Sequence, residues 1–251
     1  MFRPDYDKFR AVASTEIKPP YFVDIWYNYR FESEGASLKD VNGSFQFITK
    51  EQQRNYIQMP SIKIRDDRTA MIEHPNRNFI HQGIWIDIFP LDPVPPFNDE
   101  KQALNFEVSK ILLMTAAFPQ NIIAAIKNNQ RLAVSVDDLK KILSLTYRER
   151  AINFENFMGK IFFKSERVRH YHNIYFFPKS NSMKTEDFSD VIYLPFEKIE
   201  VPAPVGYESI LTDYYGDWHK MIITHTHAHE YSTDVPFEEY CQKSFRFAQS
   251  L

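Results

Sequence analysis

The stretch GIWIDIFPLDPVPP, residues 83–96, constrains the fold more than any other part of the chain. Its apolar run, residues 84–89, has the length and the Trp, Ile and Phe content of a buried β-strand, and Pro90 ends it. Asp87 stands in the middle of this run, and a second carboxylate, Asp92, follows just past its end. A carboxylate on a buried strand is costly unless it is paired or binds a metal. The sequence therefore predicts a partner for Asp87.

Two kinds of partner are open for Asp87. In the structural interpretation, its carboxylate accepts hydrogen bonds from the backbone or pairs with Arg65 or Arg77. In the functional interpretation, it binds a hard cation such as Mg²⁺, which takes one or two carboxylates plus phosphate oxygens of a substrate. Asp92 is ambiguous in the same way, because Asp before Pro is also a common turn residue.

Strand patterns gather in the first hundred residues, after a helical pattern over residues 5–13. Residues 19–31 are rich in aromatic side chains and favour extended structure, and residues 44–48 alternate weakly. Residues 60–72 alternate as a half-buried strand does, with a turn at 66–68.

Helical patterns dominate after residue 98. Asp99 is a candidate cap for a helix whose apolar residues recur at helical spacing, namely Leu104, Val108, Ile111 and Leu112. Further helical patterns cover residues 121–129, 135–163 and 236–249. Residues 190–220 indicate a short strand, a proline-bounded turn and a two-turn helix that ends at Gly216. We therefore expect one α+β domain over residues 1–251, rich in strands over 1–98 and mainly helical over 99–251.

Composition excludes several classes of function. The formal net charge of −3 argues against a nucleic-acid partner, and the single cysteine, Cys241, cannot form a disulfide within the chain. No run approaches 18 apolar residues, and the first residues lack the apolar stretch of a signal peptide. We expect a cytoplasmic protein. Basic residues beside Phe and Ile over residues 148–172 leave a peripheral contact with the inner membrane face open, although an ordinary solvated helix face is the simpler interpretation.

Three motifs in order resemble the LicD family. They are KIRDDRT at 63–69, IDIFPLD at 86–92 and the segment PFEKIEVPAPVGYESILTDYYGDW at 195–218. The start, MFRPDYDKF, is similar to a helix start of the same family. The resemblance implies a nucleotidyltransferase-like mixed sheet. It also implies transfer of phosphocholine or a similar phosphorylated group to cell-surface glycans such as lipopolysaccharide.

The resemblance implies roles for several residues. Asp87 would be the catalytic carboxylate and a metal ligand, with Asp92 as a second ligand. Lys63, Arg65 and Thr69 would line the neighbouring strand and face the phosphates of the donor. Such an arrangement suits phosphoryl chemistry, where catalysis is mostly positioning and neutralisation of charge.

The family's aspartate cluster has no counterpart in the sequence. It would lie just before Met1, and with it the first strand of the sheet. A bound Mg²⁺ or Mn²⁺ needs several convergent carboxylates, so this cofactor is expected only if the native protein supplies them upstream. Two explanations are open: a native protein longer than this sequence, which we favour, or a short form without a competent metal site. We expect the sequence as it stands to be nearly inactive in transfer.

Three histidines alternate in THTHAHEY, at positions 225, 227 and 229. On a strand, His225, His227 and His229 would share one face, which is a conceivable Zn²⁺ or Ni²⁺ ligand set. A polar loop with chance histidines is the simpler interpretation. By resemblance to the family, His225 and His227 are instead predicted to contact phosphate or substrate.

The leading hypothesis is thus a LicD-like phosphotransferase that takes a phosphorylated small group from a nucleotide-activated donor to a polysaccharide acceptor. The alternative is a non-catalytic glycan- or nucleotide-binding protein on the same scaffold.

Overall fold

The computed structural model describes residues 1–31, 46–48, 60–72, 81–96, 98–170, 182–220, 230–232, 235–236 and 239. This part of the chain is a mixed α+β structure with six α-helices and several small sheets, most of them antiparallel. The helices are α1 (Arg3–Glu16), α3 (Glu100–Ala117), α4 (Pro119–Lys127), α5 (Val136–Leu143), α6 (Tyr147–Ile161) and α8 (Tyr207–Tyr215). A short 3₁₀ helix, η2 (Thr185–Phe188), precedes the last hairpin.

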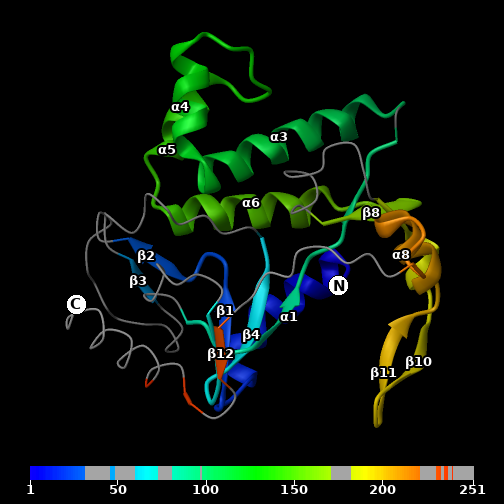
Figure 1. Cartoon of the computed structure of the whole chain (residues 1–251). Coiled ribbons are helices and arrows are strands. Elements are labelled where there is room, and N and C mark those ends of the chain that lie inside the picture. The colour runs from blue at the N-terminus through cyan, green and yellow to red at the C-terminus, as the bar shows by residue number, and fades with distance from the viewer. Residues whose placement is uncertain are drawn as a thin grey trace.

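The sheet that carries the Asp87 strand has three antiparallel strands in the order β1-β4-β6. They are β1 (Tyr21–Ile25), β4 (Ile62–Asp66) and β6 (Trp85–Ile88). Side chains alternate between the two faces of a strand. One face of this sheet carries Val23, Ile25 and Ile62, which are buried in the main core with residues of α1, α3 and α6. In Figure 1 the sheet runs up to α6, with α1 beside it.

The helical layer is built on α3 and α6, which lie along each other in Figure 1, with α4 and α5 at one end. The Asp99 side chain caps α3 by accepting a hydrogen bond from the Gln102 amide at 3.0 Å, as the sequence predicts. The apolar face of α6, including Phe154 and Met158, is buried in the core. These apolar residues of α6 therefore stabilise the fold.

A buried ion-pair network ties the first helix to the rest of the molecule. Arg3 donates from Nε and Nη2 to the two carboxylate oxygens of Asp92, each at 2.6 Å, and from Nη1 to Glu155 of α6. The other oxygen of Glu155 accepts a hydrogen bond from Trp26 Nε1 at 2.6 Å. All four side chains are buried. Burial alone would lower the pKa of Arg3, but the carboxylates of Asp92 and Glu155 raise it well above its ordinary value.

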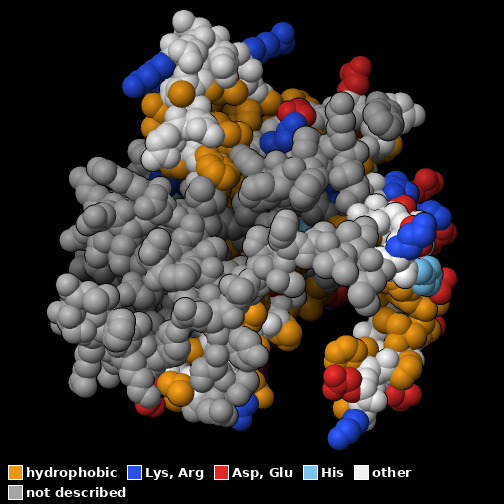
Figure 2. Space-filling model, viewed as in Figure 1, with side chains coloured by type: hydrophobic (Ala, Val, Ile, Leu, Met, Phe, Trp, Pro, Cys, Tyr) orange, Lys and Arg blue, Asp and Glu red, His pale blue; other side chains and the backbone are white. Residues whose placement is uncertain are grey.

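The remaining strands form four small sheets. Strands β7 (Asp92–Pro93), β8 (Arg167–Arg169) and β9 (Met183–Lys184) make one of them, and β10 (Val191–Phe196) and β11 (Ile199–Pro204) form a separate hairpin. The hairpin stands away from the body of the molecule (Figures 1 and 2). The last two pairs are β2 (Tyr29–Phe31) with β3 (Gln46–Ile48), and β5 (Ala70–Ile72) with β12 (Glu230–Ser232).

Most predicted elements are confirmed, including α1, β1, β4, β6, α3 and α8, whose end is Gly216. The expectation that β6 is buried is wrong. In the described chain β6 pairs with β4 alone, so it lies at the edge of its sheet, and Ile86 is 65% exposed. Strands also occur later than expected, because residues 199–204 form β11 and not a turn.

No single helix of the described chain is long and apolar enough to cross a membrane. Only α3 and α4 taken together meet the length and composition of a span, and these two helices are bent by 113° where they join.

Candidate functional site

The polar face of the β1-β4-β6 sheet brings the predicted strand residues together. Lys63 of β4 lies directly opposite Asp24 of β1 on one side and Asp87 of β6 on the other. Residues directly opposite each other in adjacent strands share a face. Asp24, Lys63 and Asp87 therefore form one row across the sheet, on the face away from the apolar core.

Asp87 is held by two neighbours at the exposed end of this row. Lys63 Nζ lies 2.7 Å from Asp87 Oδ1, and Trp85 Nε1 donates to Asp87 Oδ2 at 3.0 Å. The Lys63 ammonium also lies 4.5 Å from the centre of the Trp85 ring, within the range of a cation–π contact. The Asp87 side chain is 32% exposed, so solvent and a ligand can reach the pair. This arrangement corresponds to the structural interpretation of Asp87, but with Lys63 as the partner in place of Arg65 or Arg77.

Arg65 belongs to the buried end of the same face. Its Nε donates to Asp24 Oδ2 at 2.8 Å, and its Nη1 lies 3.4 Å from the Gly83 carbonyl oxygen. Both side chains of the Arg65–Asp24 pair are 2% exposed. A guanidinium this enclosed and this well paired orders the sheet, and Lys63 is the more accessible of the two cations on this face.

Asp24 and Trp85 are site residues that the sequence analysis missed. Asp24 stands in YFVDI as Asp87 stands in WIDI, a single carboxylate within an apolar strand. This shared pattern is the signal that could have identified Asp24. Trp85 in the sequence indicates only a strand, but the side chain two residues before Asp87 lies on the same face of that strand.

Thr69 supports the turn between β4 and β5. Its hydroxyl donates to the Asp66 carbonyl oxygen at 2.9 Å and accepts from the Ile84 amide at 2.9 Å. The hydroxyl thus donates one hydrogen bond to the backbone and accepts another from it. In this structure Thr69 fixes the approach to β6; its predicted contact with phosphate remains a prediction.

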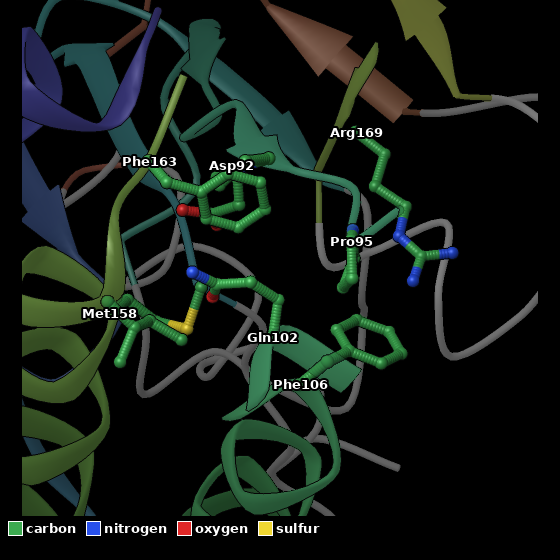
Figure 3. A pocket seen from close by; sticks show the side chains of 9 residues that line it. Asp92, Pro95, Gln102, Phe106, Met158, Phe163 and Arg169 are labelled. Carbon is green, nitrogen blue, oxygen red and sulfur yellow. The ribbon is translucent and has the colours of Figure 1, made fainter. Parts of the chain in front are cut away.

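Asp92 lies apart from this row, in the ion pair with Arg3. Figure 3 shows it beside a small crevice that is also lined by Gln102, Phe106 and Arg169. The Arg169 guanidinium lies 4.4 Å from the centre of the Phe106 ring. The cavity volume is about 10 Å³, which accommodates roughly one water molecule and no larger ligand. Because both Asp92 oxygens accept from Arg3, its contacts here are those of a structural residue, and its predicted role as a metal ligand remains untested.

A larger cleft begins at Asp87. Its volume is about 770 Å³, within the range of small-molecule sites. One wall comes from Asp87, Ile88 and Phe89, and the other walls come from Met183, η2, the β10–β11 hairpin and α8. Its aromatic lining includes Phe89, Phe188, Tyr207, Tyr214 and Tyr215, with the His170 imidazole stacked on the Phe89 ring at 4.9 Å. The accessible end of the polar row therefore opens onto an aromatic and largely apolar cleft.

The described residues do not by themselves form the ligand set of a Mg²⁺ ion. Among them, no three or more His, Cys, Asp or Glu side chains lie close enough together to hold a metal. The Asp87 oxygens face Lys63 and Trp85. His225, His227 and His229 lie outside the described residues, as does Arg77. The predicted Mg²⁺ or Mn²⁺ therefore depends on carboxylates other than those described.

Comparison with known proteins identifies no relative: the chain matches no protein-family model, no curated protein and no solved structure.

Proposed function

We propose that this chain is a LicD-like phosphotransferase, which moves a phosphorylated small group such as phosphocholine from a nucleotide-activated donor to a cell-surface polysaccharide. The class comes from the resemblance of three sequence motifs. The location of the site comes from the Lys63–Asp87 pair, which is the observation that carries the proposal. We propose the nucleotidyltransferase-like sheet on the same grounds, with β1-β4-β6 as its described part.

The Lys63–Asp87 pair suits a phosphorylated ligand for electrostatic reasons. The Lys63 side chain is 17% exposed, and its ammonium group can exchange part of its contact with Asp87 for a phosphate oxygen. Phosphoryl transfer requires positioning and neutralisation of charge more than covalent chemistry by the protein. The aromatic cleft beside Asp87 offers ring faces to a quaternary ammonium head group, which such rings attract.

The second candidate is a nucleotide- or glycan-binding protein without transfer activity. One observation favours it: both oxygens of Asp87 are already engaged, by Lys63 and by the Trp85 indole. A carboxylate in this state holds the Lys63 ammonium group in place. The Lys63–Asp87 pair can then bind a ligand without activating it.

Donor binding and donor cleavage separate the two candidates. We would measure binding of cytidine diphosphocholine by calorimetry, and release of cytidine monophosphate with Mg²⁺ present, on protein produced in its native host. The transferase predicts binding and release, with release reduced about 100-fold or more in Asp87→Asn, as is typical when a transition-state contact is removed. Lys63→Met is expected to weaken binding about tenfold or more, because it removes the accessible cation.

The matched control is Asp66→Asn. Asp66 is a carboxylate of the same sheet, but it pairs with Arg68 and lies outside the row. It is expected to leave binding and release unchanged. Binding without release would favour the second candidate. The absence of any binding would contradict the phosphocholine transferase and the nucleotide-binding form of the second candidate.

A further inference from the structure

The β10–β11 hairpin has one face that is entirely apolar. Its register places Ile192 opposite Ala203, Leu194 opposite Val201 and Phe196 opposite Ile199, and these six side chains share one face. We call this the apolar hairpin face. It becomes more exposed towards the tip, where Phe196 is 59% and Ile199 is 62% exposed. A two-stranded hairpin is marginal in water without packing on one face, so this face is suited to contact with an apolar ligand.

The apolar hairpin face is continuous with the cleft at Asp87. Leu194 and Ala203 belong to both, so the lining of the cleft extends without interruption onto the hairpin. Figure 2 shows the molecule hollowed beside the hairpin, with hydrophobic side chains along it. Among the described residues that line the cleft, Asp87 is the only acidic side chain, and none is Lys or Arg. The result is an apolar trough that meets a charged side chain at Asp87, the ion-pair partner of Lys63.

We infer that the cleft and the apolar hairpin face bind the hydrocarbon chain of a single-chain amphiphile, whose polar end lies at Asp87 and Lys63. The distribution of charge matches such a ligand, because an amphiphile has one polar end and an otherwise apolar body. The binding of this hydrocarbon chain does not depend on the proposed transfer activity. The identification of the amphiphile as a lipid-linked substrate rests on the proposed function.

A small molecule fits this surface better than a bilayer does. The cleft is bordered by β6, η2, the hairpin and α8 and has a volume of about 770 Å³, a small-molecule size. A membrane-binding hairpin usually carries basic residues that attract anionic lipids. Here Lys198 at the tip is flanked by Glu197 and Glu200, so the tip does not favour an anionic surface.

Alkyl maltosides test the inference, because their head group has no charge and no phosphate. Calorimetry with octyl, decyl and dodecyl maltoside, each below its critical micelle concentration, is expected to show saturable binding of one molecule to the full chain. Each methylene buried should tighten binding about fourfold. Leu194→Glu, in the wall of the cleft, should weaken dodecyl maltoside binding about tenfold or more. Its neighbour Tyr193, on the opposite face and 65% exposed, provides the control: Tyr193→Glu should leave binding unchanged.

A second variant covers the case in which Leu194→Glu fails to fold. Ile199→Glu alters a residue that is about as exposed as Tyr193 but belongs to the apolar hairpin face. It should weaken binding of the dodecyl chain several-fold and leave the octyl chain unaffected, because only the longer chain reaches the tip.

Several results would overturn the inference. They include no saturable binding, affinity that does not increase with the length of the alkyl chain, and equal losses of maltoside affinity in Tyr193→Glu and Ile199→Glu. Binding to phosphatidylcholine vesicles without binding of monomeric maltoside, or self-association through the hairpin in place of maltoside binding, would overturn it as well. Because the maltosides contain no nucleotide, such a failure leaves the donor assay of the proposed function unaffected.

Discussion

His81 is the side chain whose surroundings most clearly link protonation to stability. Its ring stacks on Phe22 with centroids 4.8 Å apart, and its Nε2 lies 2.8 Å from Asp67 Oδ1. Burial lowers the pKa of His81; the Asp67 carboxylate partly offsets this effect, and the Arg65 guanidinium adds to it. The folded state therefore favours the neutral imidazole.

This lowered pKa predicts a loss of stability in acid. A histidine whose pKa is lower in the folded state binds a proton more readily when unfolded, so its contribution is complete above the unfolded pKa of about 6.5 and is lost as the pH falls below that value. Urea unfolding at several pH values between about 5 and 8 should show this decrease in wild type and a smaller one in His81→Gln. The exposed His219 is the control, and His219→Gln should keep the wild-type slope. An unchanged slope in His81→Gln would contradict the prediction.

At the scale of single elements, the start of α6 has a full capping box. Thr146 Oγ1 accepts from the Glu149 amide at 3.3 Å, and Glu149 Oε2 accepts from the Thr146 amide at 2.9 Å. Thr146→Ala removes the N-cap and should lower the free energy of unfolding by about 1 kcal/mol, measured by urea unfolding. The same substitution at Thr212, an exposed interior position of α8, should be neutral or slightly stabilising because Ala is the better helix former. Equal losses at the two positions would refute the capping argument.

Elements with local signals could be predicted from the sequence, and their pairing could not. The Asp99 cap of α3 and the alternation in β4 are each specified by residues close together in the sequence. The structure confirms both elements. Strand β11 was missed because Pro202 and Pro204 are typical of turns; they are tolerated here because a two-stranded hairpin consists of edge strands. The role of Asp24 was missed because its partner Arg65 is 41 residues away in sequence, and no local pattern specifies that pairing.

The molecule as a whole depends on contacts that bring distant segments together. Arg3 joins α1 to Asp92, 89 residues away, and to Glu155, 152 residues away. The same helix start is linked to the segment that follows β6, since the Arg3 amide donates to the Leu91 carbonyl oxygen at 3.1 Å and the Leu91 amide donates to the Met1 carbonyl oxygen at 2.7 Å. The sheet that carries Asp87 is thereby fixed against the helical layer, and the loss of Arg3 should affect the site and the core together.

Arg3→Met is the substitution that tests this connection. It removes the cation and leaves two buried carboxylates without their partner, which typically costs about 3–5 kcal/mol. Urea unfolding followed by tryptophan fluorescence should show this loss, because Trp26 shares Glu155 with Arg3. The control is Arg68→Met, which breaks the pair with Asp66; since the Arg68 side chain is 62% exposed, stability should change little. Similar losses in the two variants would mean that the Arg3 network contributes no more than a surface ion pair, and that apolar packing alone holds α1 against the sheet and α6.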